Sequence, residues 1–170
     1  MKQKKKLNIA IATISDTRTF ANDKSGDVLE DRIKKDNHNF FSRCIIKDDI
    51  DKIEEFFKAC LKNNLIDIII TTGGTGLTGR DSTPEVLKTI IEKEIPGFGE
   101  IFRQISFKKI GTSALQSRAV AGIAKGKFFF SLPGSPSACK DAWDNILKFQ
   151  LNINHKPCNL IELIPRLLEE

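Results

Sequence analysis

A strand-like run that leads directly into a glycine-rich turn and then into a helix start is the feature that most constrains this chain. Residues 68–72 (IIITT) are apolar or β-branched, four glycines follow within seven positions, and Thr83 and Pro84 form a helix start. Glycines leave backbone N–H groups uncovered, so that these groups can close around an anion. The segment therefore predicts a phosphate-binding loop at the end of a buried strand.

The spacing of apolar residues predicts the remaining elements. Strands are expected over residues 7–15, 39–46, 65–72 and 127–132. Helices are expected over residues 25–35, 50–62, 83–93, 100–109, 113–124 and 137–149, with a short strand or helix over 160–168. Ser25 and Thr83 are expected to cap two of these helices. Because helices separate the strands, the sequence predicts an α/β fold with a mostly parallel sheet and helices on both faces.

Three loops of unusual composition follow predicted strands. They are the polar loop that begins at Ser15 and Asp16, the glycine-rich loop from Gly73, and the loop at residues 133–136 (PGSP). The carboxyl ends of parallel strands meet at one edge of a sheet, and ligands of open α/β sheets bind there. We therefore expect these loops to form one active site.

Residues 74–79 match the pattern G-x-G-x-x-G, which suggests a dinucleotide site. In that fingerprint the helix opens inside the motif and an acidic residue follows about 20 positions later. Here the helix start at Thr83 comes later, and no strand that ends in an acidic residue follows, so a dinucleotide site is disfavoured. A P-loop is disfavoured as well, because Arg80 and Asp81 stand where it carries Lys and Ser or Thr.

Three acidic residues near the same edge are candidates for a cation site. Asp81 follows the glycine run, and a carboxylate beside a phosphate would be repelled unless a cation lies between them, which suggests Mg²⁺. Asp48 and Asp49 end the second predicted strand near that edge. The alternatives are structural: Asp81 could cap the helix at Pro84, and Asp48 and Asp49 could form a turn or a helix cap. Spacing alone leaves both interpretations open for Asp81 and favours the structural one for the other two.

Size and composition limit the kind of protein. A chain of 170 residues with 40% hydrophobic and 29% charged residues predicts one domain over residues 1–170, with a basic flexible tail at 1–6. That tail nearly accounts for the net charge of +5, which disfavours a nucleic-acid partner. No membrane span or secretory signal is recognisable, so the cytoplasm is the expected location. The four cysteines and two histidines lack the spacing of a zinc site.

Several motifs taken together resemble one known family. The runs TTGGTG at 71–76, DSTPE at 81–85, PGFGE at 96–100 and LPGS at 132–135 are similar to motifs of the molybdopterin-binding family that includes MoaB and MogA. The resemblance extends from residue 7 to about residue 151. The run at residues 115–122 and the short C-terminus look more like the MoaB branch than the MogA branch.

The resemblance implies a fold, a reaction and an assembly. The family fold is a three-layer α/β/α sandwich, usually assembled as a homotrimer or as a hexamer of two trimers. Active members serve molybdenum cofactor biosynthesis by adenylylating molybdopterin with ATP and Mg²⁺, which releases pyrophosphate. The alternative is a protein that binds or carries molybdopterin without catalysis. Other proteins of molybdenum cofactor biosynthesis are candidate partners.

The resemblance also assigns site residues. The two functional aspartates of the family correspond to Asp81 and Asp48, with Asp49 as the alternative if the turn aligns one residue differently. These three aspartates are the expected Mg²⁺ ligands. The substrate-binding and phosphate-binding residues would be Ser15, Asp16, Gly73, Gly74, Thr75, Gly76, Ser117, Pro133, Gly134 and Ser135. Arg80, Arg118 and Lys140 are candidate phosphate partners.

Overall fold

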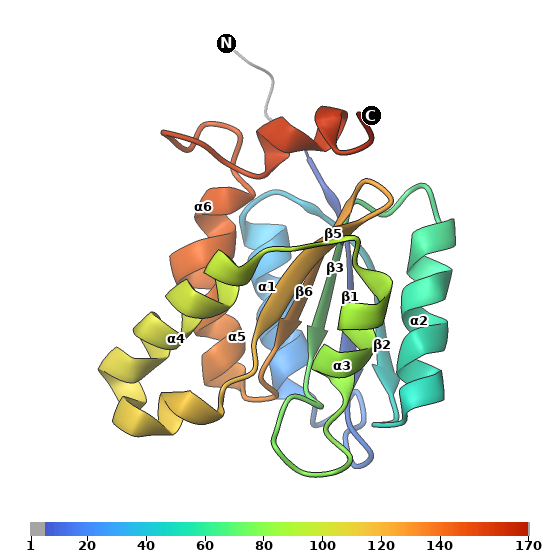
Figure 1. Cartoon of the computed structure of the whole chain (residues 1–170), viewed down its shortest axis with the longest axis vertical. Coiled ribbons are helices and arrows are strands. Elements are labelled where there is room, and N and C mark those ends of the chain that lie inside the picture. Colours follow the sequence, from blue (N-terminus) through green and yellow to red (C-terminus); the bar gives the residue numbers. More distant parts are fainter. Residues whose placement is uncertain (1–5, 170) are drawn as a thin grey trace.

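The computed structural model describes residues 6–169, so the predicted basic tail lies outside the described residues except for Lys6. Within them the chain forms strands and helices in alternation (Figure 1). The strands are β1 (Asn8–Ile14), β2 (Asn39–Ile46), β3 (Ile68–Thr72), β4 (Lys93–Glu94), β5 (Val120–Ala124) and β6 (Lys127–Leu132). The α-helices are α1 (Lys24–Lys35), α2 (Ile50–Lys62), α3 (Thr83–Ile90), α4 (Pro96–Ile110), α5 (Pro136–Ala142) and α6 (Lys148–Gln150). Two segments are 3₁₀ helices, η1 (Gly111–Gln116) and η3 (Ile161–Arg166), and η2 (Trp143–Leu147) is a π-helix.

One six-stranded sheet, with the order β2-β1-β3-β6-β5-β4, organises the described part of the chain. Strands β2, β1, β3 and β6 are parallel, whereas β5 is antiparallel to β6 and β4 is antiparallel to β5. The prediction of a mostly parallel sheet is confirmed. The register pairs Thr13 with Thr72 and Thr72 with Leu132. Strands β1, β3 and β6 therefore end at the same edge, which brings the loops that follow them together.

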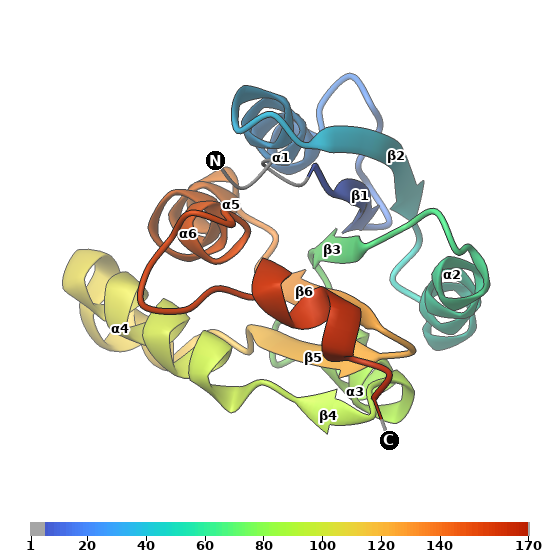
Figure 2. The same cartoon turned by 90° about the horizontal axis from the view of Figure 1, so that it is seen from above.

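Helices cover both faces of this sheet and make a three-layer α/β/α sandwich (Figure 2). Helices α1, α4 and α5 lie on one face, and α2 and α3 lie on the other. The core on the first face includes Leu29, Phe102 and Trp143. The core on the second face includes Ile53 and Phe57 of α2, whose four-residue spacing keeps both side chains on one side of the helix. The fold that the resemblance implied is confirmed.

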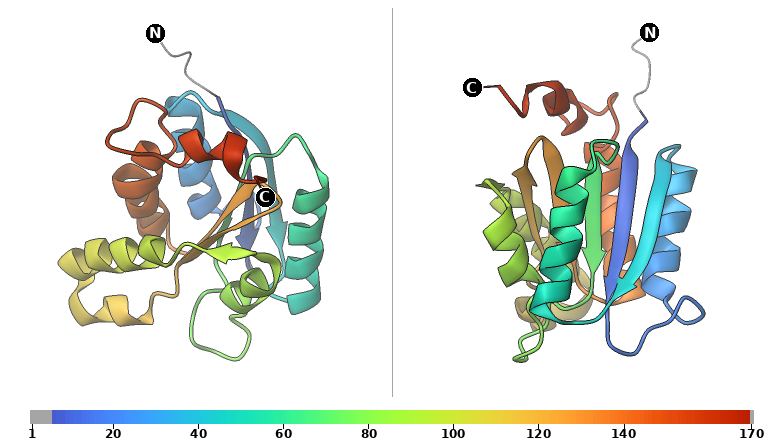
Figure 3. Two further views of the ribbon diagram at one scale, coloured as in Figure 1. Left: turned by 45° about the horizontal axis from the view of Figure 1, so that its top comes forward. Right: turned by 90° about the vertical axis from the view of Figure 1, so that its right-hand side faces the viewer.

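The carboxyl edge of the parallel strands lies far from the start of β1 and from η3, which are at the opposite end of the molecule (Figure 3). The segment between β3 and α3, residues 73–82, extends outward from this edge (Figure 1). We call it the glycine loop. The start of β1 and η3 therefore leave the loops at this edge uncovered.

The predicted helix over residues 113–124 is wrong. Residues Gly111–Gln116 form the 3₁₀ helix η1, and the residues from Val120 form β5. The alanine-rich composition favours a helix locally, but β5 pairs with β6 through a tight turn in which Lys125 and Gly126 have φ values of 45° and 74°. Pairing with a buried neighbouring strand therefore overrides the local helix preference.

Several element boundaries also differ from the prediction. Helix α3 ends at Ile90 instead of residue 93, because residues 93–94 pair with β5 as the short strand β4. Helix α4 begins at Pro96 instead of residue 100, with the proline in the first turn, where its missing N–H is not needed. Strand β3 begins at Ile68, three positions later than expected. The C-terminal segment forms the helix η3.

Both predicted helix caps are wrong. Asp23, not Ser25, is the N-cap residue of α1, and its carboxylate accepts a hydrogen bond from the Gly26 N–H at 3.0 Å. Ser82, not Thr83, occupies the N-cap position of α3, and it makes no side-chain capping hydrogen bond. Ser25 is thereby free to donate its hydroxyl to another segment at the edge of the sheet.

Histidine and cysteine side chains form no metal centre in the described part of the chain, where no group of three or more His, Cys, Asp and Glu could hold an ion. The four cysteines are free. Burial raises the pKa of Cys60 to about 12 and that of Cys139 to about 11, so both are protonated packing residues. Among residues 6–169, no helix has the length and apolarity that crossing a bilayer requires.

Candidate functional site

A cavity of about 430 Å³ opens at the carboxyl edge of the parallel strands. Its walls come from the segments that follow β1, β2, β3 and β6, which are far apart in the sequence. The predicted convergence of the loops after β1, β3 and β6 is confirmed. The lining residues are 13–18, Asp23, Ser25, Asp48, 72–76, Asp81 and Gly134.

Two glycines at the start of the glycine loop have backbone conformations that other residues rarely adopt. Gly73 has a φ of 100° and Gly74 a φ of 62°. A Cβ on Gly73 would lie 2.2 Å from the carbonyl oxygen of Ile14, and one on Gly74 would lie 2.3 Å from Thr83 Oγ1. The Gly73 N–H donates to the Leu132 carbonyl at 3.0 Å. Glycine is therefore required for the loop to turn closely between the ends of β1 and β6.

Asp48 follows β2 and contributes a half-buried carboxylate to the cavity. Its Oδ1 atom is buried and has no hydrogen-bond partner among residues 6–169. A Cβ on Gly74 would lie 3.1 Å from this oxygen, so the carboxylate lies against the glycine loop. Burial raises the pKa of Asp48, and the negative charges of Asp81 and Asp16 raise it further. The cavity therefore concentrates negative charge and includes one buried carboxylate oxygen that lacks a hydrogen-bond partner among residues 6–169.

Asp81 lies near the end of the glycine loop and also lines the cavity. Its carboxylate accepts hydrogen bonds from the hydroxyl of Thr78 and from the Thr78 N–H, the latter at 3.0 Å. These bonds, together with one from the Gly76 N–H, lower the pKa of Asp81 despite its partial burial. The carboxylate stays ionised and does not cap α3, so the structural alternative for Asp81 is wrong.

Asp49, in contrast, has a structural role. It is the N-cap residue of α2, and its carboxylate accepts a hydrogen bond from the Lys52 N–H at 3.1 Å. It is exposed and does not line the cavity. Of the two aspartates that follow β2, the structure brings Asp48 to the cavity and places Asp49 at the start of a helix.

Arg80 connects three segments at the rim of the cavity. Its guanidinium forms an ion pair with the Asp16 carboxylate at 2.8 Å and donates to the Asp48 carbonyl at 3.0 Å. The Asp16 carboxylate in turn accepts a hydrogen bond from the Asp48 N–H at 3.3 Å. The Ser15 hydroxyl accepts from the Arg18 N–H at 3.2 Å and shapes the loop after β1. The rim thus carries an exposed cation among carboxylates.

A buried ion pair beneath the cavity was not predicted from the sequence. The Asp23 carboxylate accepts hydrogen bonds from Thr13 Oγ1 at 2.7 Å and from the Arg43 guanidinium at 2.8 Å. Burial alone would raise the pKa of Asp23, but Thr13, the Gly26 N–H and Arg43 together lower it. The one sequence signal was an acid just before a helix start, which is typical of an N-cap.

The loop after β6 contributes only Gly134 to the lining. The Gly134 carbonyl accepts the Ser25 hydroxyl at 3.0 Å, and the Pro133 carbonyl accepts the Thr72 hydroxyl at 2.9 Å. Ser135 caps α5 through its side chain. Lys140 is exposed on α5 and does not line this cavity. The Pro-Gly-Ser segment therefore acts mainly by closing one side of the site.

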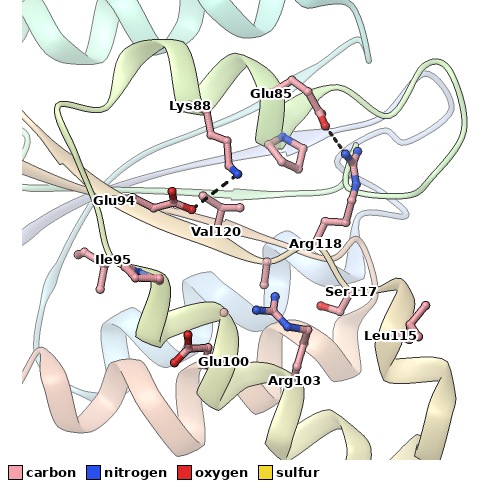
Figure 4. A pocket seen from close by; sticks show the side chains of 14 residues that line it. Glu85, Lys88, Glu94, Ile95, Glu100, Arg103, Leu115, Ser117, Arg118 and Val120 are labelled. Carbon is pink, nitrogen blue, oxygen red and sulfur yellow. Dashed lines mark hydrogen bonds and ion pairs between the residues drawn. The ribbon is translucent and has the colours of Figure 1, made fainter.

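Ser117 lies in a second cavity, of about 410 Å³, between α3 and α4 (Figure 4). Its Oγ atom is buried and has no hydrogen-bond partner in the described part of the chain. Two ion pairs cross this cavity, one between Glu85 and Arg118 and one between Lys88 and Glu94 at 3.7 Å. The structure thus separates Ser117 from the residues of the glycine loop with which the resemblance groups it.

Comparison with known proteins covers nearly the whole chain. Residues 10–152 match the sequence family described as probable molybdopterin binding domain. The chain is 42% identical over 151 residues to molybdenum cofactor biosynthesis protein B of Escherichia coli K12, which covers 89% of each protein. It is 43% identical over 144 residues to the protein of that name from Halalkalibacterium halodurans, which covers 84% of this chain and 85% of the relative. A crystal structure of molybdenum cofactor biosynthesis protein B superimposes with a TM-score of 0.87 and 38% identity over 98% of both chains.

Proposed function

We propose, from the premise that this chain belongs to the molybdopterin-binding MoaB family of molybdenum cofactor biosynthesis proteins, that it adenylylates molybdopterin with Mg-ATP. Its place in molybdenum cofactor biosynthesis follows from the family itself. The adenylyl transfer is the step that the geometry of the cavity supports best.

One observation carries the proposal: a carboxylate oxygen and backbone N–H groups that lack hydrogen-bond partners in the described part of the chain belong to residues that line the same cavity. Asp48 Oδ1 has no hydrogen-bond partner among residues 6–169. The N–H groups of Gly74 and Thr75, the second and third residues after β3, have no partner in the described part of the chain either. Uncovered amides attract phosphate oxygens, whereas a carboxylate repels them unless a cation lies between. This combination favours a ligand that brings phosphate and a divalent cation together.

The residues of the cavity fit Mg²⁺. This ion is commonly held by one or two carboxylates together with substrate phosphates and water. Asp48 offers a carboxylate oxygen that has no hydrogen-bond partner among residues 6–169, and Asp81 offers a carboxylate whose pKa is lowered by its hydrogen bond from Thr78. These two side chains would hold the ion. When bound, Mg²⁺ would neutralise negative charge on the triphosphate during the transfer.

The transfer requires no covalent intermediate on the protein. An oxygen of the molybdopterin phosphate forms a bond to the α-phosphorus of ATP, while the bond from that phosphorus to the bridging oxygen of the β-phosphate breaks. Pyrophosphate leaves with the bonding electrons, and AMP remains attached to the pterin phosphate. The task of the chain is to hold both phosphates in line. The N–H groups of Gly74 and Thr75 are the donors that we assign to them.

The test is incubation of the pure protein with molybdopterin and Mg-ATP, with pyrophosphate release and the mass of the pterin product as readouts. We expect pyrophosphate only when pterin, ATP and Mg²⁺ are all present. Pterin binding that is indifferent to Mg²⁺ and ATP, with no pyrophosphate, would instead identify a carrier and reject the adenylyl transfer.

Binding of Mg²⁺ is expected to weaken in acid. The pKa of Asp48 is raised by burial and by Asp81 and Asp16, whereas that of Asp81 is lowered. As the pH falls from about 7 toward about 4, Asp48 takes up a proton first and ceases to be a ligand. Calorimetric titration of the protein with Mg²⁺ in two buffers of different ionisation enthalpy should show proton release on binding at the acid end. An affinity that is independent of pH over this window would contradict the assignment of Asp48.

We also propose that the chain assembles as a homotrimer or as a hexamer of two trimers. Helix α4 and η1 expose Phe107, Ile110 and Leu115, of which Leu115 is 81% exposed. Large apolar side chains that cluster on one surface favour a protein contact. Sedimentation equilibrium should give an oligomer for the wild type and smaller species for the double variant Phe107→Asp, Ile110→Asp. Leu65→Asp is the control, since Leu65 is similarly exposed but lies in the segment between α2 and β3, and α2 covers the opposite face of the sheet from α4 (Figure 2).

A further inference from the structure

Among the described residues, Arg18 is the one basic residue that lines the cavity at the carboxyl edge of the parallel strands. It lies in the loop after β1, which extends from the same edge as the glycine loop (Figure 1). The acidic residues of the lining are Asp16, Asp23, Asp48 and Asp81. An anion that enters this cavity therefore meets a single guanidinium among several carboxylates.

Two of these carboxylates already have basic partners. Asp23 pairs with Arg43 at 2.8 Å, and Asp16 pairs with Arg80 at 2.8 Å. The other two are the proposed ligands of Mg²⁺. A divalent cation that lies between two ionised aspartates brings no net positive charge, so it does not neutralise a triphosphate by itself. A triphosphate in this cavity needs a further cation.

The guanidinium of Arg18 has donors to spare. Its one side-chain hydrogen bond among residues 6–169 runs from Nη1 to the Asn22 carbonyl at 3.2 Å, and it forms no ion pair with a carboxylate of those residues. The same carbonyl accepts the Lys24 N–H at 3.0 Å, so it stays satisfied when the guanidinium turns away. An arginine carries five N–H donors, which leaves most of those of Arg18 for a ligand.

The backbone around Arg18 is held in place although its side chain is exposed. The Ser15 hydroxyl accepts the N–H groups of both Thr17 and Arg18 at 3.2 Å. Farther along the loop, the Asn22 side chain accepts the Thr19 N–H at 2.8 Å. The loop therefore presents the guanidinium from a fixed position at the cavity wall, while the side chain itself can turn toward a ligand.

The other arginines near the glycine loop are engaged. Arg118 reaches this loop from the second cavity (Figure 4). Its Nε donates to the Thr75 carbonyl at 3.2 Å, its Nη2 donates to the Asp81 carbonyl at 2.7 Å, and its Nη1 contacts the Glu85 carboxylate. A planar guanidinium that is held by three partners has a fixed orientation. Arg118 would have to give up a carboxylate and two carbonyls to bind a phosphate.

Arg80 and Lys140, the remaining candidate phosphate partners, are placed less favourably than Arg18. The guanidinium of Arg80 would have to leave the Asp16 carboxylate and the Asp48 carbonyl. Lys140 does not line the cavity. Arg18 gives up only one neutral hydrogen bond, and a charge-assisted bond to phosphate is stronger than the bond that it replaces.

We propose that Arg18 binds the β- and γ-phosphates of the nucleoside triphosphate and stabilises the pyrophosphate that leaves. The inference rests on the proposed function for this role in turnover. A guanidinium can hold two phosphate oxygens at once. Negative charge builds up on the pyrophosphate as its bridging oxygen separates from the α-phosphorus, and a guanidinium beside it lowers the energy of that charge without giving or taking a proton. Arg18 would thereby make the cavity select triphosphates over monophosphates.

The test is calorimetric titration of the pure protein without molybdopterin. The probes are the Mg²⁺ complex of α,β-methylene-ATP, whose α–β bridge cannot be cleaved, the Mg²⁺ complex of inorganic pyrophosphate, and AMP. In Arg18→Met we expect the affinity for the first two probes to fall by about 10-fold to about 100-fold, the usual effect of losing hydrogen bonds to a charged group. The affinity for AMP should be unchanged, because AMP lacks the phosphates that Arg18 would contact.

Lys47→Met is the matched control. Lys47 is an exposed cation directly before Asp48, at the same edge of the sheet. It has no ion pair or side-chain hydrogen bond among residues 6–169, and it does not line the cavity. This variant removes the same charge and should keep the wild-type affinities. Arg18→Lys should be intermediate, since lysine keeps the charge but lacks the planar fork.

Equal affinity of Arg18→Met and wild type for pyrophosphate would overturn the inference, as would an equal loss in Lys47→Met or a wild type that does not bind pyrophosphate. A loss of AMP affinity as large as that of the triphosphate would place Arg18 on the α-phosphate and reject its contact with the leaving group. A wild type that binds the probes through Arg18 but releases no pyrophosphate from molybdopterin and Mg-ATP would reject the proposed reaction alone. An active wild type with unchanged probe affinities in Arg18→Met would reject this inference alone.

Discussion

Asparagine in place of Asp81 is expected to lower the rate of pyrophosphate release from molybdopterin and Mg-ATP about 100-fold or more, the usual cost of losing a group that stabilises transition-state charge. The substitution removes one negative charge and keeps the size of the side chain. Thr78 can still donate to the remaining oxygen, so the glycine loop should keep its shape. The loss should therefore appear in kcat and in Mg²⁺ affinity, with little change in the unfolding temperature.

Asp49→Asn is the matched control for this experiment. Asp49 is one residue from Asp48 but caps α2, and asparagine is an equally good N-cap residue. This variant should keep the wild-type rate and stability. The assignment of Asp81 fails if Asp81→Asn releases pyrophosphate at an undiminished rate. It fails also if Asp49→Asn loses as much activity, because the loss would then follow from negative charge near the edge in general.

The residues that surround the cavity are expected to lower the free energy of unfolding of the chain. An ionised carboxylate whose pKa is raised in the folded state binds more protons there than in the unfolded state, so its charge at neutral pH opposes folding. Asp48 is such a group. Ser82 Oγ and Thr83 Oγ1, at the start of α3, are also buried without hydrogen-bond partners in the described part of the chain. Unsatisfied groups that collect around one cavity are expected where function, not stability, sets the residue types.

The sequence was sufficient for the features that depend on local pattern and strand direction. Strands β2 and β6 and helix α2 were predicted to the residue, because polar or turn-forming residues bound each of them and α2 has apolar residues at helical spacing. The convergence of the loops at Ser15, Gly73 and Gly134 also followed, since the ends of parallel strands share one edge. Those two rules account for most of the cavity.

Features that depend on partners distant in the sequence could not be predicted. Strand β5 is held by pairing with β6, and nothing in its alanine-rich sequence signals this. Arg43 is 20 positions from Asp23, and Arg118 is 37 positions from Asp81. Sequence spacing carries no information about such contacts. The choice between Asp48 and Asp49, in contrast, depends only on where α2 begins, because Asp49 directly precedes its first residue and caps it.

The glycine loop offers the most severe test of the fold at this edge. Alanine in place of Gly73 is expected to destabilise the chain by about 3 kcal/mol or more, measured as the free energy of unfolding in urea. The φ of 100° is strained for any residue with a side chain, and the new Cβ would lie 2.2 Å from the Ile14 carbonyl oxygen. This oxygen belongs to the end of a buried strand, so it cannot move aside as a flexible side chain could.

Gly79→Ala is the control, because a Cβ at Gly79 would meet nothing within 4 Å. This variant should change stability by no more than about 0.5 kcal/mol, as surface substitutions usually do. If Gly73→Ala were as stable as Gly79→Ala, the loop could lift away from β1 without cost. The N–H groups of Gly74 and Thr75 would then have no fixed direction, and the loop could not be a preformed phosphate cradle. A large loss at Gly73 alone, in contrast, would mean that the strand ends themselves hold the loop, before any ligand arrives, in the conformation that we propose for anion binding.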